Sequence, residues 1–328
     1  MPSLTGRYLL SDLLSKELPG HSPVVEGLIW ERDNIVLVGK EKTGKSIFSM
    51  QLACSLTSCH PFLGEYNIPK PLVVAYIQAE GKLADTKWSL ERMLRTIPCD
   101  QSKLSIFYYP GLSIDTDEGL KFLKSEIDAW QKPDAIFLDP LYMLMQGDLI
   151  DNQDARKMVF NLRSLSEYYQ ALIWIVHHAH RPKFDPKKGI ILEEGDDAIF
   201  GSFVWKAYPD NVYLLQKTVG SKQGRTLHGG TQRMDRVADR FDFLLQGSAS
   251  QDDALYFELL PDTRANTTKI MEHFPDNGFT ITIPDLVTKT GYSRATIWSI
   301  INRLSQSGNI VTSDRQAHPI QWSKHLSK

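Results

Sequence analysis

The segment Gly39–Ser46 constrains the fold of this chain more than any other part of its sequence. It has the order Gly-Lys-Glu-Lys-Thr-Gly-Lys-Ser, which fits the pattern Gly-x-x-x-x-Gly-Lys-[Ser/Thr]. The apolar run Asn34–Val38 precedes it, and the helical stretch Lys45–Thr57 follows it. Glycines in such a turn let backbone N–H groups face a phosphate, and the helix N-terminus adds the positive end of its dipole. The sequence therefore predicts a phosphate-binding loop between a strand and a helix.

Short β-branched runs alternate with helical stretches through roughly the first 215 residues, which is typical of a parallel sheet flanked by helices. We expect strands at Asn34–Val38, Leu72–Gln78, Ala135–Asp139, Leu172–Val176 and Asn211–Gln216. We expect helices near Lys45–Thr57, Lys82–Thr96, Gly119–Trp130 and Asp154–Tyr168. Each expected strand is apolar through its length, as a strand covered on both faces should be. The predicted fold class is therefore α/β, with a mostly parallel sheet.

The side chains of the loop have the chemistry that a nucleoside triphosphate needs. Lys45 can reach the β- and γ-phosphates, and the Ser46 hydroxyl can hold Mg²⁺. We expect the nucleotide to be bound by Gly39, Lys42, Thr43, Gly44, Lys45, Ser46 and Ile47. ATP and Mg²⁺ are therefore the expected cofactors.

Three further motifs follow the loop, and each is a strand that ends in a polar residue. Val73–Glu80 ends in Glu, Ala135–Pro140 contains Asp139 at the strand end, and Leu172–His178 ends in two histidines. Together with the lead-in Val24–Trp30, these motifs resemble the RecA-like ATPases over roughly residues 22–245. Among them, the chain looks most similar to the RepA-type replicative helicases of plasmids and phages.

This resemblance implies a role for each strand end. Glu80 would orient the attacking water, and Asp139 would hold Mg²⁺ together with Ser46. His178, or alternatively His177, would sense the γ-phosphate. Because imidazole is a common metal ligand, a metal site at the histidines is the other interpretation, although no carboxylate or thiol spacing supports it.

Ring-forming relatives complete their site with a cation from the neighbouring subunit, which stabilises charge in the transition state. The segment Arg225–Asp235 resembles the strand whose basic residues cross that interface. Arg233 is the first choice for this cation, with Lys217 and Lys206 as alternatives. The RepA-like pattern often has Arg before a Gly-Ser pair, whereas this chain has Phe200 there.

Two loops at the same sheet edge line a DNA channel in the family, and they correspond to Leu141–Asp151 and Arg181–Gly201. The second contains four basic residues that could contact phosphates, namely Arg181, Lys183, Lys187 and Lys188. It also contains four acidic residues, namely Glu193, Glu194, Asp196 and Asp197. A solvated mobile loop is therefore an equal alternative for Arg181–Gly201.

The C-terminal segment resembles a winged-helix domain. We expect helices at Thr263–Phe274 and Pro284–Thr290, a third from Ser293 to about Gln306, and a two-stranded wing within Gly308–Trp322. Ile297, Ile300, Ile301 and Leu304 recur at helical spacing toward a core. Arg294 and Arg303 would then lie on the exposed side of the recognition helix and could contact DNA. Binding of a protein partner is the alternative.

Composition and charge limit the remaining possibilities. The net charge is −2, so any DNA binding must be local, and residues 262–328 do have three more basic than acidic residues. No apolar run is long enough for a membrane span, and Met1–Gly20 lacks the apolar stretch of a signal peptide. The three cysteines have neither disulfide nor metal-ligand spacing. We therefore expect a cytoplasmic protein.

The expected organisation is an N-terminal extension at residues 1–21, a RecA-like ATPase domain at 22–250 and a small winged-helix domain at 262–328. The resemblance implies a DNA-dependent ATPase that forms a homo-oligomer, with a hexamer favoured, around single-stranded DNA. Such a protein would be a helicase of a plasmid, phage or other mobile element. The alternative is an ATP-switched DNA-binding regulator, such as a replication initiator or recombination mediator, without unwinding activity.

Overall fold

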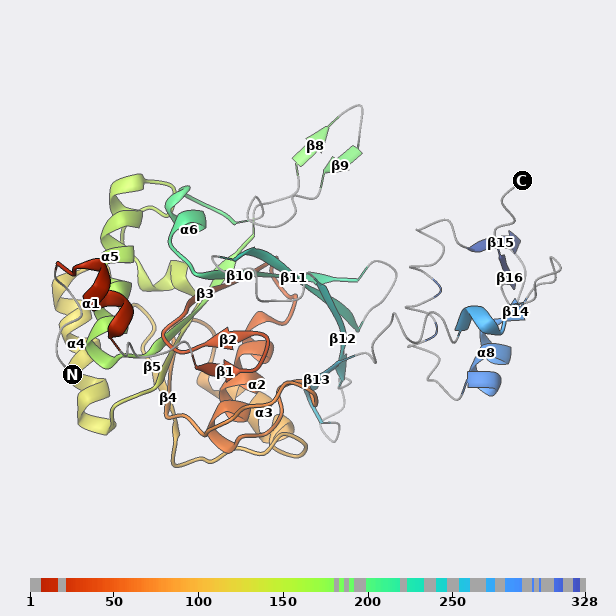
Figure 1. Cartoon of the computed structure of the whole chain (residues 1–328), viewed down its shortest axis with the longest axis horizontal. Coiled ribbons are helices and arrows are strands. Elements are labelled where there is room, and N and C mark those ends of the chain that lie inside the picture. Colours follow the sequence, from red (N-terminus) through yellow and green to blue (C-terminus); the bar gives the residue numbers. More distant parts are fainter. Residues whose placement is uncertain are drawn as a thin grey trace. The chain divides into compact units, whose positions relative to one another are not determined.

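The computed structural model describes residues 7–16, 22–179, 183–185, 189–191, 199–218, 223–232, 240–246, 254–259, 270–274, 281–290, 297, 301, 310–314 and 321–324. The chain divides into two compact units, Met1–Glu258 and Leu259–Lys328 (Figure 1). The first unit therefore continues past residue 250, where the sequence places the end of the ATPase domain. None of the helices formed by the described residues is long and apolar enough to cross a membrane.

A nine-stranded sheet forms the centre of the first unit, in the order β13-β12-β11-β10-β3-β7-β6-β4-β5. Its strands are β3 (Asn34–Gly39), β4 (Val74–Gln78), β5 (Leu104–Tyr108), β6 (Ala135–Asp139), β7 (Leu172–His178), β10 (Asn211–Lys217), β11 (Gly224–Gln232), β12 (Arg240–Gln246) and β13 (Tyr256–Leu259). The strands from β10 to β5 pair in parallel, whereas β11 is antiparallel to both β10 and β12. The predicted α/β class with a mostly parallel sheet is confirmed.

Parallel pairing brings the carboxyl ends of the central strands to one edge. Gly39 at the end of β3 is in register with His178 at the end of β7. Gln78 at the end of β4 is in register with Asp139 at the end of β6. Ligands bind at this edge in open α/β sheets, so the topology places the predicted motifs side by side there.

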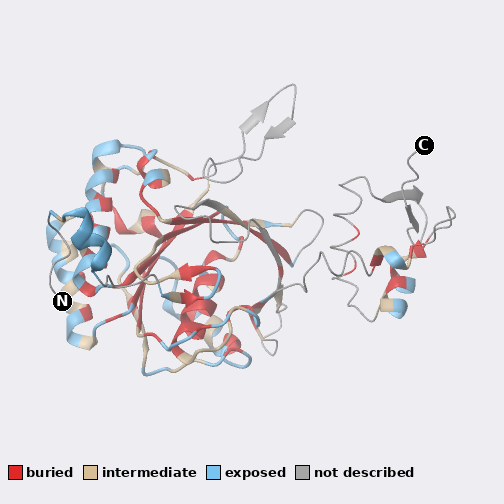
Figure 2. Cartoon of the chain, viewed as in Figure 1, coloured by how far each residue is buried: buried red, intermediate tan, exposed pale blue. Residues whose placement is uncertain are grey.

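Helices cover both faces of these strands, as their fully buried, apolar sequences require. They are α2 (Lys45–Ser58), α3 (Leu83–Met93), α4 (Asp117–Trp130), α5 (Asn152–Tyr169) and the short α6 (Val204–Ala207). Alternate strand residues such as Val36 and Ile175 pack in one core with Leu162 of α5 and Leu123 of α4. Figure 2 shows the buried residues concentrated along the sheet and α2.

The opposite face of the sheet is aromatic. Tyr76, Phe137 and Trp174 come from three neighbouring strands, with ring centroids 5.6 and 5.8 Å apart along the row. Phe48 of α2 stacks on Trp174 at 6.4 Å. The Trp174 indole Nε1 also donates a hydrogen bond of 2.9 Å to Ser49 Oγ. These contacts fix the helix that follows the phosphate-binding loop against the sheet.

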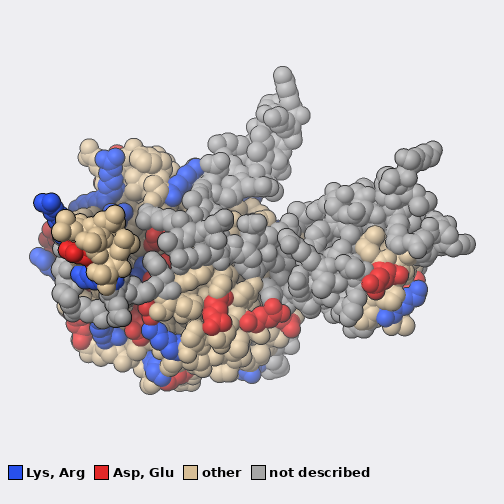
Figure 3. All heavy atoms as spheres, viewed as in Figure 1, with Lys and Arg blue, Asp and Glu red and all other residues tan. Residues whose placement is uncertain are grey.

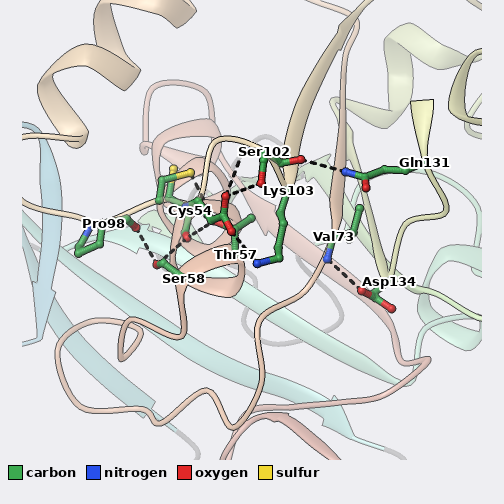
Figure 4. Close-up of polar contacts among 11 residues, drawn as sticks. Cys54, Thr57, Ser58, Val73, Pro98, Ser102, Lys103, Gln131 and Asp134 are labelled. Carbon is green, nitrogen blue, oxygen red and sulfur yellow. Dashed lines mark hydrogen bonds and ion pairs between the residues drawn. The ribbon is translucent and has the colours of Figure 1, made fainter. Parts of the chain in front are cut away.

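The C-terminal end of α2 is tied to the segment that leads into β5 (Figure 4). Ser58 Oγ donates to the Pro98 carbonyl at 2.9 Å, and the Asp100 N–H donates to Thr57 Oγ1 at 3.1 Å. Thr57 Oγ1 also lies 3.4 Å from Cys99 Sγ. Hydroxyl side chains thus satisfy backbone groups that the helix end and the loop would otherwise leave without partners.

Several smaller elements differ from the prediction. Strand β5 was not predicted, because four of its five residues are only partly buried and Phe107 alone is buried. Short strands β1 (Pro23–Val25) and β2 (Ile29–Trp30) form a hairpin before β3. The predicted loop Arg181–Gly201 contains an antiparallel pair, β8 (Lys183–Asp185) and β9 (Gly189–Ile191). The four glycines of Gly220–Gly230 favour a turn between two antiparallel strands, but most of this segment is strand, since β11 begins at Gly224. A short helix α1 (Leu10–Ser15) precedes the hairpin.

The second unit contains β14 (Ile281–Thr282), α8 (Ile283–Thr290), β15 (Ile310–Asp314) and β16 (Gln321–Lys324). Its strands form an antiparallel sheet in the order β14-β16-β15. Ile270, Phe274, Leu286, Ile297 and Ile301 form part of its buried core. Thus α8 and the inward positions of Ile297 and Ile301 agree with the sequence, whereas β16 extends to Lys324, beyond the range predicted for a wing, and also pairs with β14. Ile300 and Leu304 lie outside the described residues, and the winged-helix assignment stays a prediction.

Candidate nucleotide-binding site

The phosphate-binding loop begins where Gly39 ends β3 and finishes where Gly44 begins α2. Gly44 has a φ of 98° and provides no side-chain cap for α2, so the first N–H groups of the helix face the loop without that partner. At Gly39, a Cβ atom would lie 2.6 Å from the Leu215 carbonyl oxygen, which only glycine avoids. A backbone of this shape, with uncapped N–H groups, is suited to bind an anion.

Lys45 is buried at the base of the loop, with 7% of its surface exposed. Its Nζ donates to the Gly39 carbonyl at 2.7 Å and the Lys40 carbonyl at 3.0 Å. Burial lowers the pKa of Lys45 to about 8, although the nearby carboxylates of Asp139, Glu41 and Glu80 oppose this shift. A buried ammonium held only by carbonyl oxygens and nearby carboxylates would be strongly stabilised by a phosphate.

Arg225 of β11 holds the backbone of the phosphate-binding loop through a hydrogen bond. Its Nε donates to the Thr43 carbonyl at 2.7 Å, while the Thr43 hydroxyl donates to the Lys40 carbonyl at 2.9 Å. The sequence predicts that basic residues of Arg225–Asp235 reach a neighbouring subunit. Arg225 was not one of the candidates for that role, and its side chain is buried against the loop of its own chain. Arg233 lies outside the described residues.

Asp139 lies at the end of β6, with 4% of its surface exposed. Its Oδ2 accepts a hydrogen bond of 2.5 Å from the Tyr76 hydroxyl, and the Ser46 hydroxyl is also within hydrogen-bonding reach. Burial raises the pKa of Asp139, although Tyr76, Ser46 and the Lys45 charge oppose the rise. A carboxylate beside a hydroxyl is a hard oxygen donor set of the kind that Mg²⁺ prefers, so these residues fit that ion.

Glu80 follows β4 and is exposed to the cavity. The chain around it is held by the Gln78 side chain, whose Nε2 donates to the Glu80 carbonyl at 2.9 Å. Thr86 Oγ1 in turn donates to Gln78 Oε1 at 2.7 Å. A carboxylate on a fixed backbone at this edge can accept a proton from a water molecule or orient it.

The structure distinguishes the two histidines at the end of β7. His178 lines the cavity, and burial together with the Lys45 charge lowers its pKa, which favours a neutral imidazole. His177 is fully buried, with its ring against Trp205 at 5.8 Å between centroids. Within the described residues no three His, Cys, Asp or Glu side chains are grouped to hold a metal ion, and His180 lies outside them. His178 is therefore the histidine that can contact a ligand.

One cavity of about 710 Å³ joins these groups. From the loop it is lined by Lys42, Gly44, Lys45, Ser46 and Ile47, and from the strand ends by Glu80, Asp139 and His178. Gly39 and the buried Thr43 belong to the loop but do not line the cavity. The predicted nucleotide and metal residues thus meet in one place.

The structure does not bring every predicted residue to this cavity. Lys206 in α6 and Lys217 at the end of β10 do not line it. Lys183 is described only as part of the backbone of β8. The other predicted DNA contacts lie outside the described residues, namely Arg181, Lys187, Lys188, Arg294 and Arg303.

The segment Leu141–Asp151 is partly helical and held by hydrogen bonds to the rest of its unit. Its first half is the 3₁₀ helix η1 (Leu141–Leu144), in which Leu141 and Leu144 are fully buried. The Asp115 carboxylate accepts hydrogen bonds from the backbone N–H groups of Gln146 and Gly147, at 3.0 and 2.9 Å. The segment also has no Lys or Arg. Phosphate contacts by basic side chains are therefore excluded for this segment.

Sequence reasoning missed three residues of the site. Arg225 holds the loop, Tyr76 binds Asp139, and Tyr142 of η1 lines the cavity beside Glu80 and His178. Phe200, which stands where the family pattern often has Arg, also lines the cavity. Only the order of Tyr142 after the Asp139 motif could have hinted at its place; nothing local marks Tyr76 or Arg225.

The parallel sheet, the loop and the cavity at the strand ends define an α/β fold with a P-loop nucleotide-binding site. Residues 4–183 match a family model described as an AAA domain, and the chain belongs to this family, AAA_25. Among solved structures, the chain is similar to the KaiC-like protein PH0186 from the hyperthermophilic archaeon Pyrococcus horikoshii OT3. The two share 14% identity over 73% of this chain and 94% of that one, with a TM-score of 0.46. No curated protein matches the sequence.

Proposed function

We propose that this protein is a DNA-dependent ATPase, a helicase-like motor of a plasmid, phage or other mobile element. The observation that supports ATP hydrolysis best is the single cavity that contains Lys45, Asp139 and Glu80. A phosphate-binding lysine, a metal-binding carboxylate and a water-orienting carboxylate are the parts that phosphoryl transfer to water needs.

Each group has a distinct task in this proposal. Lys45 and the N–H groups at the start of α2 would hold the β- and γ-phosphates. Ser46 and Asp139 would hold Mg²⁺, which neutralises phosphate charge when bound. Glu80 would orient the attacking water, and the neutral His178 would contact the γ-phosphate and respond to its loss.

Oligomer formation is part of the proposal, because a cation from a neighbouring copy would add to the positive charge at the phosphates. The lining residues that are basic are Lys42, Lys45 and Lys82, and none of the described lining residues is an arginine. Phe200 occupies the place where the family pattern often has one. A basic residue from a neighbouring copy would supply the charge that stabilises the transition state. A homo-hexamer around single-stranded DNA is the favoured assembly.

DNA binding is proposed from local features of the sequence. On the face seen in Figure 3, basic and acidic side chains of the described residues are interspersed. The excess of basic residues lies in 262–328, which includes Arg294 and Arg303 outside the described residues, and α8 and the three-stranded sheet belong to the same segment. Duplex DNA at this unit and single-stranded DNA at Arg181–Gly201 are the proposed contacts.

One observation favours a second function, an ATP-switched DNA-binding regulator without unwinding activity. Leu141–Asp151 has no basic residue and is held by Asp115, so one of the two expected channel loops has no Lys or Arg side chain for phosphate contacts. A regulator would need only the C-terminal unit for DNA. Strand-separation assays with ATP distinguish the two functions, since only the motor unwinds a duplex.

ATP turnover with and without single-stranded DNA tests the proposal, in the wild type, Lys45→Ala and Glu80→Gln. We expect DNA to stimulate the wild type, and each variant to lose more than ~100-fold in turnover. Lys87→Ala, an exposed lysine on α3 that pairs with Glu91, is the matched control and should behave as the wild type. If Glu80→Gln kept full turnover, Glu80 would have no part in hydrolysis. If DNA had no effect, the DNA-dependent motor would be wrong.

A further inference from the structure

Tyr142 occupies a position between the two catalytic strand ends. It belongs to η1, which starts directly after β6 and its Asp139. In the sheet, β6 lies between β4, which leads to Glu80, and β7, which ends in His178. A side chain from the end of the middle strand can therefore contact both neighbours.

Tyr142 and Glu80 line the same cavity. Burial raises the pKa of Tyr142 to about 12, and its side-chain interaction with Glu80 adds to the rise. The hydroxyl thus stays protonated at neutral pH and can donate to the carboxylate. Gln78 holds the backbone carbonyl of Glu80 and not its carboxylate, so Tyr142 is suited to set the direction of that carboxylate.

The Tyr142 ring contacts His178. Their ring centroids are 4.8 Å apart with an interplanar angle of 67°, which is an edge-to-face arrangement. One side chain therefore touches both the residue proposed to orient water and the residue proposed to sense the γ-phosphate.

Packing of the core does not account for Tyr142. Its neighbours in η1, Leu141 and Leu144, are fully buried, whereas Tyr142 is only partly buried and lines the cavity. The two leucines hold η1 against the core without it.

We propose that Tyr142 is a positioning residue that sets the Glu80 carboxylate and the His178 ring relative to each other. Loss of the γ-phosphate contact at His178 would be passed to Glu80 through one rigid aromatic ring. The inference rests on the proposed function, since it assigns Tyr142 a role in the same hydrolysis.

Tyr142→Phe removes the hydroxyl and keeps the ring, and Tyr108→Phe is its matched control. The Tyr108 hydroxyl also bonds this segment, but it donates to the Gly81 backbone carbonyl at 2.9 Å and not to the carboxylate. We expect Tyr142→Phe to lower kcat for ATP ~10-fold with KM changed less than ~2-fold, because the contact matters in the transition state. Tyr108→Phe should keep kcat within ~2-fold of the wild type.

A double-mutant cycle with Glu80→Gln separates positioning from general damage. If Tyr142 acts through Glu80, adding Tyr142→Phe to Glu80→Gln causes no further loss of kcat. Equal effects of the two tyrosine variants, or additive effects in the cycle, would overturn the inference and leave the ATPase proposal intact. A wild type without turnover would instead overturn the proposed function and the inference together. Melting temperatures show which variants are folded. If Tyr142→Phe is unfolded, Tyr142→His replaces it, because histidine keeps a ring and a hydrogen-bond donor. Tyr142→His should then retain a higher kcat than Tyr142→Ala.

Discussion

The side-chain amide of Gln51 hydrogen-bonds both backbone groups of Phe257. Gln51 Nε2 donates to the Phe257 carbonyl at 2.8 Å, and the Phe257 N–H donates to Gln51 Oε1 at 2.5 Å. Gln51 lies on α2, two turns after the phosphate-binding loop, and Phe257 lies in β13, the last strand of the sheet. The helix that starts at the nucleotide site therefore also holds the end of the first unit.

Gln51→Leu should destabilise the first unit by about 2–6 kcal/mol. The substitution leaves a buried N–H and a buried carbonyl of Phe257 without partners, and each such group costs about 1–3 kcal/mol. Urea unfolding followed by tryptophan fluorescence measures the loss. Gln153→Leu, at an exposed position of α5, should change the free energy of unfolding by less than ~0.5 kcal/mol. A Gln51→Leu protein as stable as this control would show that the contact is not needed.

Gly44→Ala should weaken nucleotide binding more than tenfold, or about 1.4 kcal/mol. Gly44 has a φ of 98°, and a Cβ there would lie 3.0 Å from the Phe257 ring at the entrance to α2. Gly64→Ala is the matched control, because Gly64 has a φ of 82° with no atom within 4 Å of the added Cβ. Both variants share the backbone strain, so both should lose stability. Titration with a fluorescent ATP analogue should show reduced affinity for Gly44→Ala alone.

Arg225→Met should reduce ATP affinity about tenfold, because it removes a hydrogen bond to the Thr43 carbonyl from a charged donor. The same titration measures this effect. Mixing Arg225→Met with Lys45→Ala subunits shows on which chain Arg225 acts. Since Arg225 holds the loop of its own chain, the mixture should hydrolyse no more ATP than the sum of its parts. Recovery of turnover on mixing would mean that Arg225 serves a neighbouring site.

Cys99 should be the most reactive cysteine near neutral pH. A hydrogen bond from Cys54 lowers the pKa of Cys99 to about 7, and Thr57 adds to this effect. The thiolate therefore forms as the pH rises through about 7, and the alkylation rate should be half-maximal there. Cys54 is buried and its pKa is raised, so it should stay unmodified.

Peptide mass spectrometry after iodoacetamide treatment from about pH 5.5 to 9.5 measures the rate at each cysteine. Cys59 is the internal reference. Thr57→Val should shift the midpoint for Cys99 to higher pH, because the substitution removes the hydroxyl that lies 3.4 Å from its sulfur. A midpoint for Cys99 in the ordinary thiol range would contradict the prediction.

The sequence allowed prediction of those parts of the site that local motifs define. Lys45, Ser46, Asp139 and His178 lie at strand ends or in the loop, so their order and the parallel sheet were enough to bring them together. Arg225 could not be found this way, because it contacts Thr43 across a separation of 182 residues. Tyr142 was missed because η1 looked like part of an irregular loop.

In the fold too, some elements could be predicted from the sequence and others could not. Fully buried strands such as β6 and β7 have continuous apolar sequences and were predicted within a few residues. The edge strand β5 was missed, because a strand with one neighbour needs neither a continuous nor an alternating apolar pattern. The turn expected over Gly220–Gly230 was placed too far along the chain, since glycine content does not show that β11 starts at Gly224.

The residues that hold the phosphate-binding loop and α2 are synthesised much later than the loop itself. The loop leaves the ribosome early, but β10, which pairs with β3, and then Arg225 follow much later. The partner of Gln51 emerges 206 residues after Gln51 itself. A nascent chain that ends before β13 would thus have the complete Gly39–Ser46 motif without the contact between Gln51 of α2 and Phe257. We expect tight ATP binding to begin only when the ATPase unit is almost fully translated, so ATP cannot guide the early steps of its folding.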